Sequence, residues 1–221
     1  MQKFDTPAPV SVVADVPAGR VEFVAADRSD TTVEVLPADP SRSRDVQAAE
    51  RTTVACADGV LRIAVAHSGN QLLGSSGSVR VTVHLPAGSR VEAKAAATEL
   101  RVVGRLGDLV FDGAYRHIEI DEAESVRLTA TDGDVVVGRL GGDAEISTAR
   151  GGIRIAEAVR GEVVLSTRAG DISVAVAAGT SATLDAGTGH GRVSNSLKND
   201  GTPGLGIRAT TASGDISARG L

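Results

Sequence analysis

The feature that most limits the fold of this chain is a ten-residue segment that recurs through its second half. The copies begin at Leu128, Ile146, Leu165, Leu184 and Ala209. Each copy contains a glycine, namely Gly133, Gly151, Gly170, Gly189 and Gly214, and these are separated by 18, 19, 19 and 25 residues. Apolar and polar residues alternate on both sides of the glycine, which indicates two half-buried strands joined by a turn. Glycine supplies the backbone angles that such a turn needs.

Stacking the copies predicts columns of inward side chains. One column contains Val126, Ala144, Val163 and Ala182, and another contains Val135, Ile153 and Ile172. One copy cannot bury its own apolar face, whereas stacked copies bury a continuous one. The longest interval between glycines contains an insertion at 198–204, whose composition predicts a surface loop. The sequence therefore predicts an all-β solenoid.

The solenoid is expected to begin before the first clear copy. Inward positions are assigned to Leu109, Phe111, Ile118 and Ile120, and further upstream to Val91, Ala93, Ala95, Leu100 and Val102. These positions continue the period-2 alternation although the glycine is lost. We therefore predict a solenoid of 17–19-residue repeats over residues 77–221.

Residues 1–76 have a different pattern. Strands are predicted at 10–16, 20–25 and 31–36, a helix at 41–52, a hairpin of 53–57 with 60–65 around Asp58-Gly59, and a loop at 69–77. Terminal elements of a solenoid generally cover its exposed strand edges. We interpret residues 1–76 as a β-rich N-terminal cap, with an independent small domain as the alternative.

Composition excludes several classes of protein. Phe4, Phe23, Phe111 and Tyr115 are the only aromatic residues, and there is no Trp to form the centre of an antibody-like sandwich. The net charge is −5 without a Lys/Arg cluster, which argues against a nucleic-acid partner. The lone Cys56 cannot form a disulfide within the chain and is expected to be a small buried side chain.

The N-terminus predicts a location in the cell. Residues 1–9 contain no apolar segment of a signal peptide, and no apolar run is long enough to span a membrane. We expect a cytoplasmic protein, or an exported one if a leader has been trimmed from this sequence.

Acidic and histidine side chains were considered as metal ligands. Asp134, Asp171 and Asp215 follow turn glycines and could align across the stack, but calcium solenoids supply several ligands per turn. We therefore expect these aspartates to stabilise turns. His67, His84, His117 and His190 have no metal-ligand spacing and are expected on the surface or in turns.

Other motifs were considered for catalysis or phosphate binding. Gly187-Thr-Gly-His-Gly191 resembles a phosphate loop, but strands are predicted on both sides, where a dinucleotide site needs a helix. The acids Asp121, Glu122 and Glu124 are interpreted as a solvated turn, and no serine has the context of a nucleophile. No catalytic, cofactor-binding or metal-binding residue is predicted, and no cofactor is expected.

The repeat unit T-x-x-G-D-[IV]-x-V, at Thr129–Val137, Thr167–Val174 and Thr211–Ile216, resembles the bacterial putative-adhesin family of β-strand repeats. The segments Phe4–Val10 and Leu85–Ser89 are similar to actinobacterial members. The sequence departs from the pattern at Gly151-Gly152 and Gly189-His190. The resemblance implies a right-handed single-stranded β-solenoid, with no assigned function and no catalytic residues.

The leading functional hypothesis is a non-enzymatic scaffold or protein-interaction module of unknown partner. Outward polar residues such as Ser166, Ser173 and Ser217 would form an extended surface suited to protein contacts. The last strand before Leu221 is expected to be a poorly covered edge through which homo-oligomers form. The alternatives are a polysaccharide-active β-helix enzyme and an exported surface adhesin.

Overall fold

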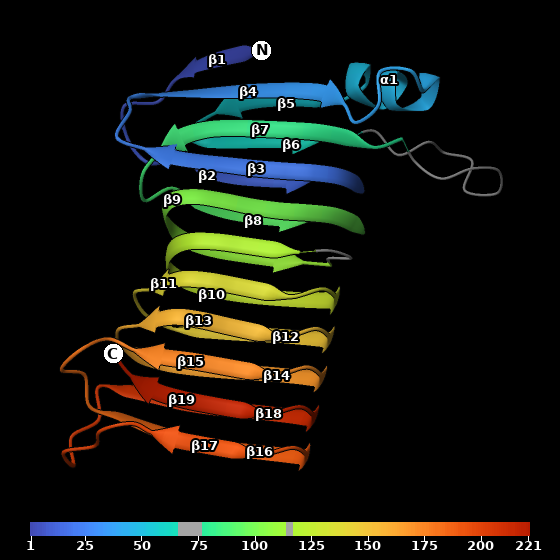
Figure 1. Cartoon of the computed structure of the whole chain (residues 1–221). Coiled ribbons are helices and arrows are strands. Elements are labelled where there is room, and N and C mark those ends of the chain that lie inside the picture. Colours follow the sequence, from blue (N-terminus) through green and yellow to red (C-terminus); the bar gives the residue numbers. More distant parts are fainter. Residues whose placement is uncertain (66–76, 114–116) are drawn as a thin grey trace. The chain divides into compact units, whose positions relative to one another are not determined.

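The computed structural model describes residues 1–65, 77–113 and 117–221, which form two compact units, Met1–Tyr115 and Arg116–Leu221. Both units consist almost entirely of β-strands, shown in Figure 1, and the one helix among the described residues is short. The predicted all-β solenoid fold is therefore confirmed.

The second unit is a stack of rungs, each made of two consecutive strands that turn sharply at a corner. Its strands are β10 (Ile118–Asp132), β11 (Val135–Leu140), β12 (Ala144–Arg150), β13 (Ile153–Ala158), β14 (Gly161–Ala169), β15 (Ile172–Val176), β16 (Ala182–His190), β17 (Val193–Ser196), β18 (Leu205–Ser213) and β19 (Ile216–Gly220). All pairings between rungs are parallel. The predicted column of Val135, Ile153 and Ile172 is confirmed, since these residues are register partners and all are buried.

The rungs at the end of this unit do not follow sequence order. β18 and β19 lie between β14/β15 and β16/β17, as Figure 1 shows. Val163 is therefore in register with Ile207, which is in register with Leu184. The prediction that Ala182 follows Val163 in the column is wrong, because a two-residue shift preserves the inward and outward alternation and cannot be detected from it.

The last strand was predicted to be a poorly covered edge through which homo-oligomers form. The same rearrangement shows that this strand is not an edge. β19 pairs with β15 on one side and with β17 on the other, so it is an interior strand. The outermost rung of this unit among the described residues is β16/β17.

The first unit contains a similar rearrangement. Its elements are β1 (Gln2–Asp5), β2 (Ser11–Asp15), β3 (Ala18–Ala26), β4 (Asp30–Pro37), α1 (Ser43–Glu50), β5 (Thr53–Ala57), β6 (Val60–Ala64), β7 (Val79–Pro86), β8 (Arg90–Lys94) and β9 (Ala97–Asp112). The rung β2/β3 lies in parallel between β6/β7 and β8/β9. Strands from the predicted cap therefore pair with strands from the predicted solenoid. The division at residues 76 and 77 stays a prediction.

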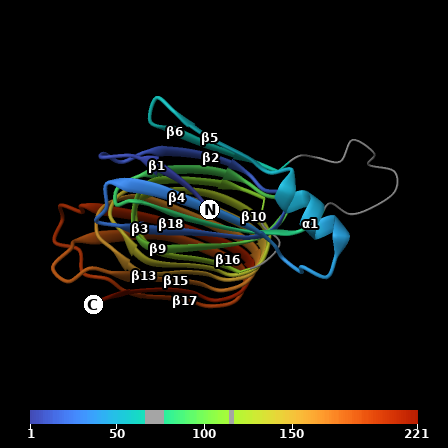
Figure 2. The ribbon, with the colours of Figure 1, turned by 90° about the horizontal axis from the view of Figure 1, so that it is seen from above.

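Antiparallel strands cover the outer edges of β6 and β7. β5 pairs with β6 in the predicted hairpin, where Asp58 and Gly59 have positive φ angles of 51° and 73°. β4 pairs with β7, and β1 pairs with β4. Figure 2 looks onto these strands, with α1 following β4. The predicted helix and hairpin are confirmed, β1 was not predicted, and residues 69–76 of the predicted loop lie outside the described residues.

A buried carboxylate and a buried pair of hydroxyls hold these covering elements. Asp45 on α1 accepts a hydrogen bond from the Ser78 N–H at 2.9 Å and is 3% exposed. The hydroxyls of Thr6 and Thr31 are 2.8 Å apart and buried, which ties the segment after β1 to β4. Hydrogen bonding removes the penalty for burying these polar groups.

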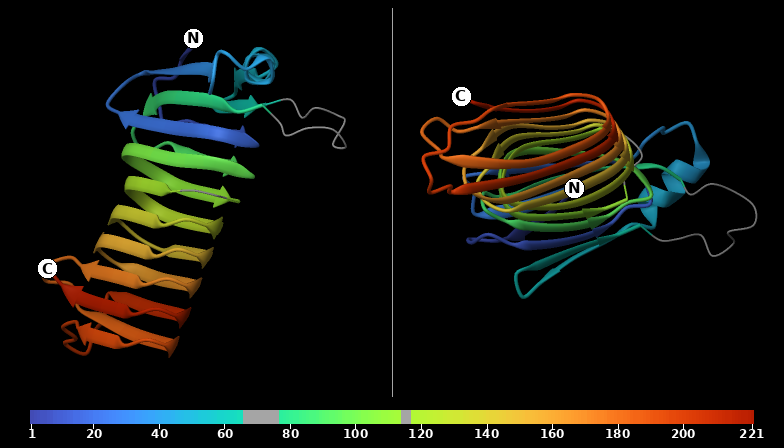
Figure 3. Two further views of the ribbon diagram at one scale, coloured as in Figure 1. Left: turned by 45° about the vertical axis from the view of Figure 1, so that its right-hand side comes forward. Right: turned by 90° about the horizontal axis from the view of Figure 1, so that it is seen from below.

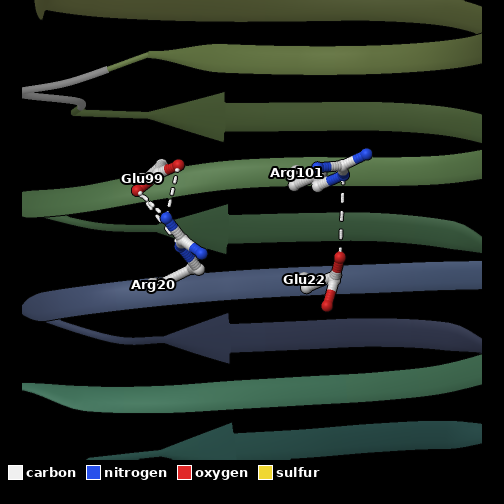
Figure 4. Close-up of polar contacts among 4 residues, drawn as sticks. All are labelled: Arg20, Glu22, Glu99 and Arg101. Carbon is white, nitrogen blue, oxygen red and sulfur yellow. Dashed lines mark hydrogen bonds and ion pairs between the residues drawn. The ribbon is translucent and has the colours of Figure 1, made fainter. Parts of the chain in front are cut away.

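Reciprocal ion pairs fix the register between β3 and β9. Arg20 lies opposite Glu99 with a closest N–O distance of 2.8 Å, and Glu22 lies opposite Arg101 at 3.6 Å (Figure 4). A shift of two residues in either direction would place two like charges opposite each other. Like charges in opposed positions destabilise a sheet, so these pairs favour one register more than they add stability.

Candidate interaction surface

Three turns of the second unit are fixed by a threonine that contacts the neighbouring rung, whereas the Thr148 hydroxyl donates to Arg150 within its own rung. The Thr167 hydroxyl donates to the Gly151 carbonyl oxygen at 3.0 Å, one rung away. Thr211 donates in the same way to Gly170 at 3.1 Å, and Thr188 to Gly214 at 2.9 Å. The T-x-x-G part of the repeat therefore describes a bond between rungs. It also shows that the turn glycine of the β16/β17 rung is Gly191, three residues after Thr188, and not Gly189 as predicted.

The aspartate that follows the glycine contacts the next rung. Asp171 Oδ1 accepts the Asp215 N–H at 2.7 Å, and Asp215 Oδ1 accepts the Arg192 N–H at 2.9 Å. Asp134 Oδ1 accepts the Gly152 N–H at 2.7 Å. These carboxylates stabilise turns, but the N–H groups belong to the neighbouring rung. Within the described ranges no group of three His, Cys, Asp or Glu side chains could hold a metal ion.

The remaining candidate residues are dispersed. His84 is half-buried in β7, His117 is exposed before β10, and His190 is exposed at the end of β16, while His67 lies outside the described residues. Cys56 is half-buried in β5, less enclosed than expected. β16 continues as a strand to His190, in keeping with the rejection of a phosphate loop there.

The acids considered for catalysis lie near arginines. Glu122 is 3.4 Å from Arg139, which is also 3.6 Å from Glu157, and Glu124 is 2.7 Å from Arg160. Asp121, the remaining acid of the three, is exposed in β10. Paired in this way on a surface, the acids define the register of neighbouring rungs.

The outward serines form two separate rows. The Ser166 hydroxyl on β14 is 3.0 Å from that of Ser147 on β12. Ser173 is in register with Ser217, which is in register with Ser194, along β15, β19 and β17. The expected polar surface is therefore present on both strand layers of the rungs.

The feature that most distinguishes the second unit is the open edge of its β16/β17 rung. Strand partners of β16 and β17 among the described residues are β18 and β19 alone, on one side. Figure 3 (right) looks onto this end of the unit. Val193 is 46% exposed and Leu184 is half-buried, although their register partners Ile216 and Ile207 are buried. The end of the apolar core is thus partly uncovered.

The orientation of the backbone donors at this edge follows from the interior rungs. There the inward residue at the start of a strand donates its N–H to the next rung, as Ile216 does to the Arg192 oxygen at 2.9 Å. Val193 has the equivalent position, so its N–H points away from β19. In β16, Ala182 donates to the Lys198 oxygen at 3.0 Å, outside β18. Since side chains and backbone groups both alternate, the N–H groups of Leu184, Ala186 and Thr188 point to the open edge.

A pocket of about 320 Å³ lies beside the start of this edge. Its lining includes Thr180, Ser181, Leu197, Lys198 and Asp200, from the loops on either side of β16/β17. Hydrogen bonds from Ser181 and Thr202 lower the pKa of Asp200, which keeps this carboxylate charged. These lining side chains include one cation, Lys198, and one anion, Asp200.

The fold and the turn chemistry define a β-solenoid module built from parallel rungs. The sequence profile of the Toastrack DUF4097 family matches residues 13–220, and the chain belongs to this family. The resemblance to the adhesin-like family of β-strand repeats is thereby confirmed, whereas the actinobacterial type stays a prediction.

Solved structures of similar proteins cover nearly the whole chain. A putative adhesin from Parabacteroides distasonis is 14% identical with a TM-score of 0.48, over 98% of this chain and 95% of that one. A putative adhesin from Bacteroides fragilis is 14% identical with a TM-score of 0.43 over the same shares. A putative cell adhesion protein from Clostridium sporogenes is 10% identical with a TM-score of 0.40, over 100% and 98%. No curated protein matches the chain.

A membrane-spanning helix needs about 20 consecutive apolar residues. In residues 1–65, 77–113 and 117–221, no helix is long and apolar enough to cross a membrane.

Proposed function

We propose that this chain is a non-enzymatic protein-interaction module that binds through the open strand edge of β16 and β17. One observation carries the proposal. Among the described residues, the β16/β17 rung has strand partners on one side only, and backbone N–H groups point to its open side, where the apolar core is partly uncovered. An edge of this kind binds another strand through main-chain hydrogen bonds.

The rest of the described surface supports binding better than chemistry. Two of the acids considered for catalysis, Glu122 and Glu124, form ion pairs with arginines, and the turn aspartates accept backbone N–H groups. A glycosidase would need two carboxyl groups facing each other across a cleft. The proposal also includes the absence of a nucleic-acid partner, because the charges of the strand layers alternate in sign between rungs, as in the column of Glu122, Arg139 and Glu157.

Two substitutions that introduce the same residue test the edge. Gly187 faces outward on β16, and a side chain there would meet no atom within 4 Å. Thr210 is its register partner on the interior strand β18. Replacement of each by Glu places the same charge on the edge or one rung inside it.

Affinity capture from native cells identifies the partner, and its binding to the chain is then measured with both proteins purified. We expect the wild type and Thr210→Glu to bind the same partner. Gly187→Glu should lose this binding. Equal binding by both variants would place the interaction elsewhere. Release of sugars in a screen of polysaccharides, with purified chain, would contradict the non-enzymatic proposal. The cytoplasmic location expected from the sequence stays a prediction, which fractionation of native cells tests.

A further inference from the structure

The end of the second unit exposes two strand edges at once. β16 and β17 are consecutive strands of one rung, and the inward residues Leu184 and Val193 lie on the two of them. A single extended peptide can pair with one edge, which leaves the other edge unpaired. A second copy of the chain presents the same rung, so a single contact brings the two apolar ends together.

We propose that two copies dock end to end through their β16/β17 rungs in a two-fold symmetric dimer. This inference rests on the proposed function, because it names the partner of the same edge. The two-fold axis crosses the middle of β16, so that β16 lies antiparallel to β16 of the second copy. The apolar ends of the two cores then meet.

The side chains on β16 are compatible with self-pairing. With Ala186 at the axis, Leu184 lies opposite Thr188 of the second copy, and Asp185 lies opposite Gly187. Outward positions at Gly187 and Gly189 have no side chain, so the charge of Asp185 meets no like charge. With Asp185 at the axis, two carboxylates would be directly opposed, which destabilises a strand pair. The charges therefore favour the register centred on Ala186.

The contact also covers the groups that the single unit leaves open. Leu184 is half-buried, and the N–H groups of Leu184, Ala186 and Thr188 point to the edge. Burial of apolar surface and pairing of strand-edge donors both favour association. The start of β16 is excluded from the contact, since the Ala182 N–H already donates to the Lys198 oxygen.

Oppositely charged substitutions at one position test both the dimer and its register. Gly187→Glu would place a carboxylate opposite Asp185 of the second copy, twice by symmetry, and Gly187→Lys would place an ammonium group there instead. Both side chains have open space, since a Cβ at Gly187 meets nothing within 4 Å, and thermal melts check that each variant folds. Thr210→Glu is the control on the neighbouring interior strand.

Sedimentation equilibrium of the purified full chain gives the result. The wild type and Thr210→Glu should dimerise alike, Gly187→Glu should weaken dimerisation by about tenfold, and Gly187→Lys should leave it unchanged or tighten it. Equal weakening by Glu and Lys would overturn the Ala186 register. A wild type that stays monomeric up to about 1 mM would overturn the dimer. In that case, loss of a different captured protein by Gly187→Glu would still support the proposed function, so the two failures are distinguishable.

Discussion

The two units end their stacks in opposite ways. In the first unit, the outer edges of β6 and β7 are paired with the antiparallel strands β5 and β4, and the four-residue strand β1 pairs with β4. In the second unit, the outer edges of β16 and β17 have no strand against them among the described residues. A short, charged last strand is a device that limits further pairing, whereas an uncovered rung can accept another strand. The stack of the first unit is thus closed by its own strands, whereas the open edge of the second unit is the one that the proposed function uses.

The largest expected effect compares a glycine inside the second unit with one on its open rung. A Cβ on Gly170 would collide with the Gly151 carbonyl oxygen, and its φ of +153° is unfavourable for other residues. Gly170→Ala should therefore lower the free energy of unfolding by about 3 kcal/mol or more. Gly187→Ala should change it by less than about 1 kcal/mol, because space is open there. Urea unfolding measures both, and a large loss at Gly187 would show that the rung is covered.

A leucine pair compares the interior of the core with its open end. Leu165 is 1% exposed on β14, whereas Leu184 on β16 is half-buried. Leu165→Ala should cost about 2–5 kcal/mol by removing buried methyl groups and leaving a cavity. Leu184→Ala should cost about 1 kcal/mol when measured on dilute monomer. Equal losses in denaturant unfolding would contradict an uncovered end.

The threonine bond between rungs has a smaller effect. Thr211→Val removes the donor to the Gly170 oxygen while retaining the shape of the side chain. The expected loss is about 1 kcal/mol in thermal or urea unfolding. Thr210→Val is the matched control on the exposed side of the same strand. If the two variants lose the same stability, the bond does not hold the rungs together.

The smallest effect concerns the closed end. Hydrogen bonds from Arg28 and Lys3, with their positive charge, lower the pKa of Asp30 from 3.8 to about 2, and Lys3 lies on β1. Since the folded pKa is the lower one, this carboxylate stabilises the fold above pH 3.8, and the contribution is lost as the pH falls towards about 2. Thermal melts of Asp30→Asn should therefore vary less with pH over this range than those of the wild type. Parallel pH curves for both proteins would show that Asp30 does not tie β1 to the unit.

Much of the fold could be predicted because local chemistry determines it. The Asp58-Gly59 turn and the helix around Asp45 follow from patterns within a few residues, and the buried column through Ile153 follows from the regular spacing of the repeats. The order of the rungs could not be predicted in this way. Inward Val, Ile, Leu and Ala residues are interchangeable between rungs, and alternation is unchanged by a shift of two residues. For the same reason, the sequence predicted the open edge at the last strand, β19, whereas the structure has it at β16/β17.

The candidate surface was predictable only in part. The repeat indicated turn-stabilising aspartates, but not that their partners lie on the next rung, because that depends on the stacking of Asp171 on Asp215. Thr188 at three residues before Gly191 is the signal in the sequence that identifies the correct turn. The open edge itself required the order of the rungs in space.

Hydrogen exchange at two protein concentrations tests the central claim most directly. If the open edge pairs with a second copy, the amides of Leu184, Ala186 and Thr188 should be protected in concentrated protein and exchange rapidly after dilution. The amides of β4 and β5 in the first unit should exchange at the same rate in both samples, because strands of their own unit pair with them. Protection of the β16 amides that does not change with concentration would contradict the account.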